Sequence, residues 1–254
     1  MLTITTSDSK KGGNTMLNSL SERSLKNIST DEKLDFIDRV EENDYFAKGD
    51  LKTLDVLSQD GDDEVRSRVA EVLVFSNTVE AEKILIRLLN DKEELVRINA
   101  CDSLCTSTSK DVITLLIEKA KKDKSSLVRA YAVMSATDIS KNIGCKEETL
   151  ELIMYLFSKE KVNITKISYY RSFLLLGQKC YLSQFLEHIN DRFYRNRCTV
   201  ANLLKDLITD KIFSKFELAK VKNALESRLK IETSLAVKNS IEKTIYMLPK
   251  EILE

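Results

Sequence analysis

Amphipathic stretches alternate with short polar breaks along most of the 254-residue chain. Val65, Val69 and Leu73 recur at four-residue spacing, and side chains at that spacing share one face of a helix. The stretch before the next break carries its own apolar residues, among them Ile84 and Leu88. A single helical hairpin cannot cover two such faces, whereas stacked hairpins bury them against each other. The pattern predicts an all-α array of stacked helical hairpins.

Three of the breaks and the helices after them are copies of one motif. They read DGDDEVRSRVAEVL from Asp60, DKEELVRINACDSL from Asp91 and DKSSLVRAYAVMSA from Asp123. In each copy a Val-Arg pair begins five residues after the Asp. A period of about 30 residues is the signature of a repeat protein.

Weaker copies continue toward the C-terminus. The sequence NDRFYRNRCTVANLL is aligned with Tyr194 and Arg195 at the Val and Arg positions, and ETSLAVKNSIEKTI has Val237 there. Between these two, Ile164 and Thr165 are aligned with Val and Arg, but their spacing from the third copy is longer. The register of this fourth copy stays open.

The motif D-x-x-x-x-V-R-x-x-A-x-x-x-L resembles the HEAT repeat, in particular the short HEAT-like repeats of phycobilisome lyases. The resemblance is strongest over 51–140, and it implies a right-handed α-solenoid of about five to six hairpins. It also implies a structural ladder, in which the Asp and Arg side chains of successive repeats hydrogen-bond to each other. The ladder residues would be Asp60, Arg66, Asp91, Arg97, Asp123 and Arg129.

The domain organisation follows from where this pattern begins. Residues 1–15 are polar and lack helical periodicity, which predicts a disordered tail. Residues 16–50 lack the motif and are interpreted as capping helices, because terminal repeats need a polar outer face. Residues 51–254 form the predicted solenoid.

Composition agrees with a helical protein and points to a cytoplasmic one. The chain has six Gly, one Pro and no Trp, which disfavours turn-rich β architectures. It has neither a signal peptide nor an apolar run of roughly 20 residues. The five cysteines are an odd number without a framework spacing, as expected for free thiols in a reducing compartment.

Residue types that carry catalysis or bind metals are sparse. Cys101 and Cys105 would share one side of a helix, but two ligands do not make a zinc site, and His188 is the only histidine. No Cys-His or Ser-His arrangement is visible. We therefore expect neither an enzyme nor a bound cofactor or metal.

The second helix of each hairpin is expected to line the inner curve, with some positions facing solvent. The predicted partner-binding residues are Arg68, Asn99, Tyr131, Met134, Tyr170, Arg171, Asn196 and Arg197. Tyr and Arg are enriched in binding hot spots. The competing interpretation is that the aromatic residues at 169–170 and 193–194 pack between helices, and that Arg195 belongs to the ladder.

These features favour a non-catalytic scaffold that binds another protein, and a narrower version has a neutralised toxin or enzyme as the partner. The alternative is nucleic-acid binding. The net charge is zero, which argues against a dedicated nucleic-acid binder, but 161–230 holds 14 Lys or Arg against six Asp or Glu. The relevant cations would be Arg171, Arg192, Arg195, Arg197 and Lys205. A third hypothesis, tetrapyrrole handling, depends on the resemblance to chromophore lyases alone.

Overall fold

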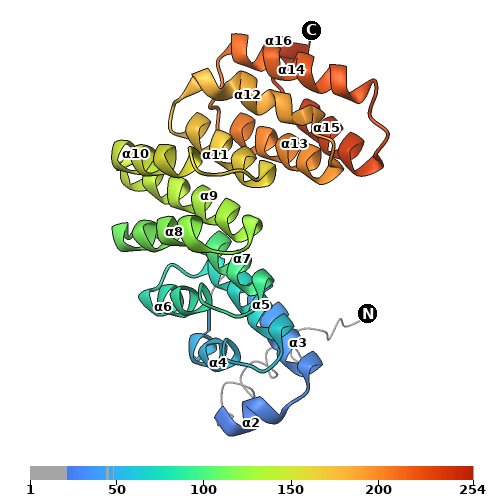
Figure 1. Ribbon diagram of the computed structural model, residues 1–254. Helices are drawn as coiled ribbons and strands as arrows, with labels where there is room; N and C mark the ends of the chain where they lie inside the picture. Colours follow the sequence, from blue (N-terminus) through green and yellow to red (C-terminus); the bar gives the residue numbers. More distant parts are fainter. Residues whose placement is uncertain (1–21, 44–45, 48, 254) are drawn as a thin grey trace, which may run out of the picture. The chain divides into compact units, whose positions relative to one another are not determined.

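The computed structural model describes residues 22–43, 46–47 and 49–253. The predicted tail at 1–15 and the first residues of the predicted cap lie outside these ranges. Within them the regular structure is helical and contains no strand (Figure 1). The prediction of an all-α solenoid of stacked hairpins is confirmed.

The chain divides into two compact units, an N-terminal unit ending at Val112 and a C-terminal unit beginning at Ile113. The boundary lies inside helix α8 (Lys110–Lys122). The N-terminal unit contains α2 (Glu22–Asn27), α3 (Thr30–Glu41), α4 (Asp50–Leu57), α5 (Asp63–Val72), α6 (Val79–Leu88) and α7 (Glu94–Ser103). Short 3-10 turns, η1 (Leu73–Phe75) and η2 (Leu104–Thr106), end α5 and α7.

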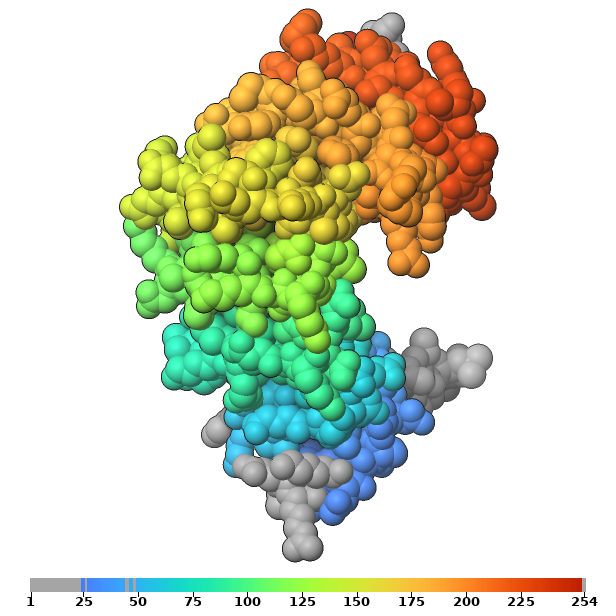
Figure 2. Space-filling model, viewed as in Figure 1, coloured from blue at the N-terminus to red at the C-terminus, as the bar shows by residue number. Residues whose placement is uncertain are grey.

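The C-terminal unit contains the longest described helix, α9 (Ser126–Ile143). Its other helices are α10 (Lys146–Phe157), α11 (Asn163–Leu175), α12 (Leu182–Glu187), α13 (Tyr194–Thr209), α14 (Lys215–Leu229), α15 (Leu235–Tyr246) and α16 (Lys250–Leu253). The 3-10 turns η3 (Lys179–Tyr181) and η4 (His188–Asn190) flank α12. In Figure 2 the yellow, orange and red segments of this unit follow one another as adjacent layers.

In both units the second helices of the hairpins pack against one another in chain order. Helix α5 packs between α3 and α7 in the N-terminal unit. In the C-terminal unit α11 packs on α9 and α13, and α13 packs on α15. This order places equivalent residues of successive hairpins next to each other within each unit.

The predicted apolar stripes are buried. Val65, Val69 and Leu73 in the first copy and Val128 and Ala132 in the third are fully inaccessible to solvent. Burial of one such Val or Leu side chain stabilises the fold by about 1.5–3 kcal/mol. A continuous apolar core in the C-terminal unit includes Ile167, Phe185, Val200, Leu204, Val221, Val237 and Ile241.

Local capping fixes where the second helices begin. The side chain of Asp62 accepts a hydrogen bond from the Glu64 N–H at the start of α5, and Ser125 caps α9 in the same way. Such caps satisfy N–H groups that have no partner inside the helix. They hold the turn between the two helices of a hairpin in a defined position.

None of the described helices is long and apolar enough to cross a membrane.

Candidate functional site

The turn between the two helices of a hairpin is organised by a buried arginine. The guanidinium of Arg66 donates from Nε and Nη2 to the two carboxylate oxygens of Asp91, at 2.7 and 2.9 Å. Its Nη1 donates to the backbone carbonyls of Asp60 at 2.9 Å and Gly61 at 3.2 Å. One side chain therefore closes its own turn and binds the carboxylate of the next repeat, which satisfies buried polar groups of both.

The same arrangement recurs in the C-terminal unit. Arg129 contacts Glu160 at 2.9 and 3.1 Å, and Arg197 contacts Glu232 at 2.7 and 2.8 Å. Both guanidinium groups also donate to carbonyls of their own turns, at Asp123 and Asp191 respectively. Two of the carboxylates are Glu, so a search for Asp at the start of each copy does not find them.

The remaining predicted ladder residues lie in the turns as well. Nη1 of Arg97 donates to the carbonyls of Asp91 and Lys92, at 2.9 and 3.0 Å. The carboxylate of Asp60 pairs with Lys33 of α3 at 2.9 Å, and both side chains are almost fully buried. The first hairpin, interpreted from sequence as lacking the motif, thus supplies Lys33 at the Arg position.

The register predicted for the fifth copy is wrong, and the structure fixes the register of the fourth copy, which the sequence left open. Arg197, and not Arg195, is the ladder residue of the fifth copy, since it follows Asp191 by six residues as Arg66 follows Asp60. In the fourth copy Thr165 occupies the Val position. It is buried, and its hydroxyl donates to the Ser126 carbonyl at 2.9 Å.

Three of the predicted partner-binding residues are buried, so the prediction that they face solvent is wrong. Arg197 belongs to the ladder, and Asn196 hydrogen-bonds to Asp191. Both were placed by the register that is two residues off. Asn99 donates from Nδ2 to Ser67 Oγ at 2.8 Å and to Glu71 Oε1 at 2.9 Å. The close packing of α5 on α7 encloses it.

Two further arginines of the predicted set form ion pairs. Arg68 binds Asp38 at 2.7 Å and Glu41 at 2.6 Å, and also Glu71. Burial alone would lower the pKa of Arg68, but these carboxylates raise it above its usual value. Arg171 lies 2.8 Å from Asp138. Burial raises the pKa of Asp138, and the positive charge of Arg171 reduces this rise without cancelling it.

The predicted tyrosines and Met134 are half-buried. Tyr170 packs against Phe157, Tyr181 and His188 with ring centroids 5.2, 6.0 and 5.6 Å apart, in agreement with the interpretation that it packs between helices. Tyr131 and Met134 lie on α9. A role of these residues in partner binding stays a prediction.

Large apolar side chains are exposed beside the ladder turns of the C-terminal unit. We call this set the ladder edge. It comprises the exposed apolar residues within four positions of Asp123, Glu160, Asp191 or Glu232: Leu127, Val162, Phe193, Tyr194, Ile231 and Leu235. Their exposed fractions run from 40% for Leu127 to 71% for Leu235. Phe193 and Tyr194 are thus exposed and do not pack between helices.

Cations accompany these apolar residues. Lys124, Lys161 and Arg192 each directly follow a ladder acid, are exposed, and form no ion pair among the described residues. The Arg192 guanidinium lies over the Phe193 ring at 4.5 Å. The carboxylates of Glu160 and Glu232 are paired with Arg129 and Arg197, and the carboxylate of Asp191 is almost fully buried, so the exposed charges beside these acids are positive.

A groove opens between the fourth and fifth turns. It is lined by Lys161, Val162 and Ile164 on one side and by Arg192 and Phe193 on the other. At this point Asn163 Nδ2 donates to Asp191 Oδ2 at 2.8 Å, which ties the two turns together. The groove therefore combines apolar side chains with the polar residues Asn163, Asp191 and Asn196, and it has a cationic residue on each side.

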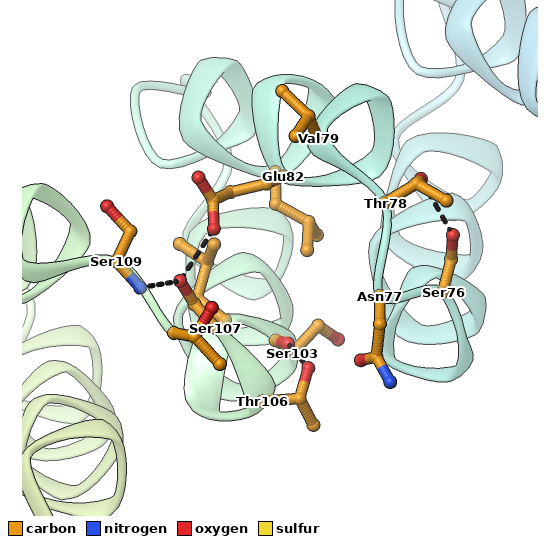
Figure 3. Close-up of a pocket in the computed structure, with 12 residues that line it drawn as sticks. Ser76, Asn77, Thr78, Val79, Glu82, Ser103, Thr106, Ser107 and Ser109 are labelled. Carbon is orange, nitrogen blue, oxygen red and sulfur yellow. Dashed lines mark hydrogen bonds between the residues drawn. The ribbon is translucent and has the colours of Figure 1, made fainter. Parts of the chain in front are cut away.

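The N-terminal unit carries a different surface. Its ladder acids Asp60 and Asp91 are directly followed by Gly61 and Lys92, and two acidic residues come next in each turn, Asp62 and Asp63 or Glu93 and Glu94. A second hollow in this unit is lined by hydroxyl groups between η1–α6 and η2–α8 (Figure 3). There Ser107 Oγ donates to Glu82 Oε2 at 2.6 Å, so the one carboxylate of the hollow already has a partner.

Groups that bind metals or drive catalysis do not converge in the described part of the chain. It contains no set of three or more His, Cys, Asp or Glu side chains placed to hold a metal ion. All five cysteines are free. Burial lowers the pKa of His188, although Asp191 opposes the shift.

The ladder carboxylates make the stability of the fold dependent on pH. Burial alone would raise the pKa of Asp91, but hydrogen bonds from Arg66 and from the Glu93 N–H lower it below its usual value. A carboxyl group with a lowered folded-state pKa stabilises the fold above its unfolded pKa, and this stability is lost as pH falls through the folded value.

We expect the free energy of unfolding to fall as the pH drops below about 4. The substitution Asp91→Asn should destabilise the protein at pH 7 and flatten this dependence, so that mutant and wild-type curves converge at low pH. Urea denaturation at pH 7, 5, 4 and 3, followed by circular dichroism, measures both curves. Parallel curves would show that Asp91 carries no pH-dependent stability.

Comparison with known proteins agrees with this architecture. Residues 51–137 match the family model of HEAT repeats, which confirms the resemblance indicated by the motif. The solved complex of CpcE and CpcF of phycocyanin lyase from Nostoc sp. PCC7120 is similar in fold, with a TM-score of 0.56 at 16% identity, over 91% of this chain and 94% of that one. Human deoxyhypusine hydroxylase gives a TM-score of 0.46 at 12% identity, over 93% and 97%. No curated protein matches the sequence.

Proposed function

We propose that this chain, whose residues 51–137 are HEAT repeats, is a non-catalytic scaffold that binds another protein through the ladder edge of its C-terminal unit. The observation that carries the proposal is the repeated exposure of large apolar residues, such as Phe193 and Leu235, beside successive ladder turns. Exposed apolar patches rimmed by polar residues mark interaction sites in soluble proteins.

The ladder supports a binding role for this edge because it holds the turns rigidly. The third and fifth turns are each fixed by a guanidinium that contacts its own carbonyls and the next carboxylate, Arg129 with Glu160 and Arg197 with Glu232. A surface that is ordered before binding loses less entropy when a partner docks. Phe193, Tyr194 and Arg192 are also of the types enriched in binding hot spots. The similar fold of CpcE and CpcF occurs in a complex of two proteins.

Nucleic-acid binding receives less support from the structure than from the sequence. Two of the cations proposed for it are engaged elsewhere, Arg171 with Asp138 and Arg197 with Glu232. Aliphatic residues of the ladder edge, such as Leu127 and Leu235, offer no favourable contact to phosphate groups. Tetrapyrrole handling is supported only by the similarity in fold to the phycocyanin lyase subunits. Binding of a toxin or an enzyme would be a narrower form of the present proposal.

The proposal is tested by affinity purification with an edge variant. The tagged wild-type chain should retain a stoichiometric protein partner from native lysate after nuclease treatment. The double substitution Phe193→Ser with Leu235→Ser should reduce this recovery at least about tenfold, because it removes two exposed contacts and leaves the core unchanged.

The matched control is Phe216→Ser with Tyr246→Ser, since these residues are at least as exposed but lie on α14 and α15 away from the ladder turns. The control should retain the partner. Recovery of a nucleic acid in place of a protein, or equal loss in both double variants, would contradict the proposal.

A further inference from the structure

The cations of the ladder edge occupy one equivalent position in three successive repeats. Lys124 follows Asp123, Lys161 follows Glu160, and Arg192 follows the acid of the fifth turn. All three are exposed and form no ion pair within the part of the chain that the structure describes. Each of these three repeats therefore presents one exposed cation at this position.

The spacing of the repeats matches the period of one type of extended chain. The second helices α9, α11 and α13 pack side by side, and packed helices lie about 8–10 Å apart. A polyproline-II chain has three residues per turn and rises about 3.1 Å per residue, or roughly 9 Å per turn. Every third side chain of such a segment would meet the same position of the next repeat.

We propose that the ladder edge of the C-terminal unit binds an extended acidic segment of the partner, with a carboxylate at every third residue and apolar side chains between them. This inference rests on the proposed function and adds the chemistry of the partner. The carboxylates pair with Lys124, Lys161 and Arg192, and the apolar side chains contact Val162 and Phe193 in the groove between the fourth and fifth turns.

Charge favours the C-terminal unit for such a segment. In the N-terminal unit Gly61 and Lys92 directly follow the ladder acids, but two acidic residues come next in each turn, Asp62 and Asp63 or Glu93 and Glu94, and these would repel a carboxylate brought beside them. In the C-terminal unit the ladder acids Glu160 and Glu232 are shielded by bidentate arginines. Opposite charges across an interface steer association and fix the register.

The test uses synthetic 12-residue peptides, labelled with fluorescein and titrated with the full chain by fluorescence anisotropy. The probe is four repeats of Asp-Leu-Ser. One control peptide has the same composition with its four Asp residues in one block, and another has Lys in place of Asp. The probe should bind at least about tenfold more tightly than either control, and added salt should weaken its binding.

Charge reversal on the protein identifies the site. The double substitution Lys161→Glu with Arg192→Glu should lower affinity for the probe at least about tenfold. The matched control Lys146→Glu with Lys220→Glu makes the same change in net charge on α10 and α14 and should lower it less than about twofold. Thermal denaturation of both variants establishes that they fold.

The possible outcomes separate this inference from the proposed function. Equal binding of the periodic and blocked acidic peptides, or displacement of the probe by a 12-nucleotide single-stranded DNA at lower concentration, overturns the acidic segment. If the cellular partner is lost from Phe193→Ser with Leu235→Ser but kept by Lys161→Glu with Arg192→Glu, the scaffold function stands and the acidic segment fails. If all variants keep the partner, both proposals fail.

Discussion

Replacement of Arg197 by alanine should lower the free energy of unfolding by about 3 kcal/mol, because removing one partner of a buried ion pair leaves an uncompensated charge. The carboxylate of Glu232 is completely buried. The hydrogen bond from Arg197 is the main cause of its lowered pKa, and a bond from Arg228 adds to it against the effect of burial. Since the variant keeps Arg228, which lies 2.8 Å from Glu232 in the wild-type structure, we expect the lower end of the range of about 3–5 kcal/mol.

The matched control is Arg195→Ala, two residues earlier on the same helix. Arg195 is exposed and donates only to the Tyr194 hydroxyl, at 3.4 Å, so its loss should leave the free energy of unfolding almost unchanged. Guanidinium denaturation followed by circular dichroism compares the two variants with wild type. Equal effects of both substitutions would contradict the assignment of Arg197 to the ladder.

Arg195 and Arg197 also show how far the sequence predicted the ladder. In the first three copies Asp, Val and Arg recur together, so the register is fixed by several residues at once. In the weaker copies Glu160 and Glu232 replace Asp, so the acid no longer marks the start of the motif. The fifth copy is aligned on Tyr194 and Arg195 instead, and its predicted register is therefore two residues too early. Counting six residues from Asp191 would have found Arg197, whereas Lys33 lies six residues after Asn27, which is not an acid, so the same count would have missed it.

The candidate binding surface was harder to predict, for a physical reason. Helical periodicity indicates which residues share a face, but it does not show which polar groups the neighbouring helix brings to that face. Asn99 is enclosed by Ser67 and Glu71 of α5, and Arg171 is paired with Asp138 of α9. Both are long-range contacts between repeats, which an amphipathic pattern within one helix does not contain.

The boundary between the two compact units was not predicted either. It lies between Val112 and Ile113, inside α8, where the amphipathic pattern continues without a break. Linkers between domains are found by a change in composition, and a helix that spans the boundary shows none. The division follows from packing, which single-helix periodicity does not describe.

The fourth repeat differs from its neighbours in what holds it together. Lys166 occupies its Arg position, six residues after Glu160, but among the described residues it forms no ion pair with Asp191. Aromatic residues of α10, α11 and η3 pack together in this repeat instead. Fully buried Phe173 stacks on Tyr181 at 4.5 Å and meets Phe157 edge-on at 5.3 Å. Such ring pairs add about 0.5–1.5 kcal/mol beyond the burial of their surface.

Replacement of Phe173 by alanine should therefore lower the free energy of unfolding by about 3–5 kcal/mol, through the cavity and the lost ring contacts. Lys166→Ala should cost less than about 0.5 kcal/mol, as should the control Tyr155→Ala, whose ring is 60% exposed on α10. Urea denaturation of the three variants measures these differences. If Lys166→Ala proved as damaging as Phe173→Ala, the fourth turn would depend on its ladder cation, and aromatic packing would not replace the ladder there.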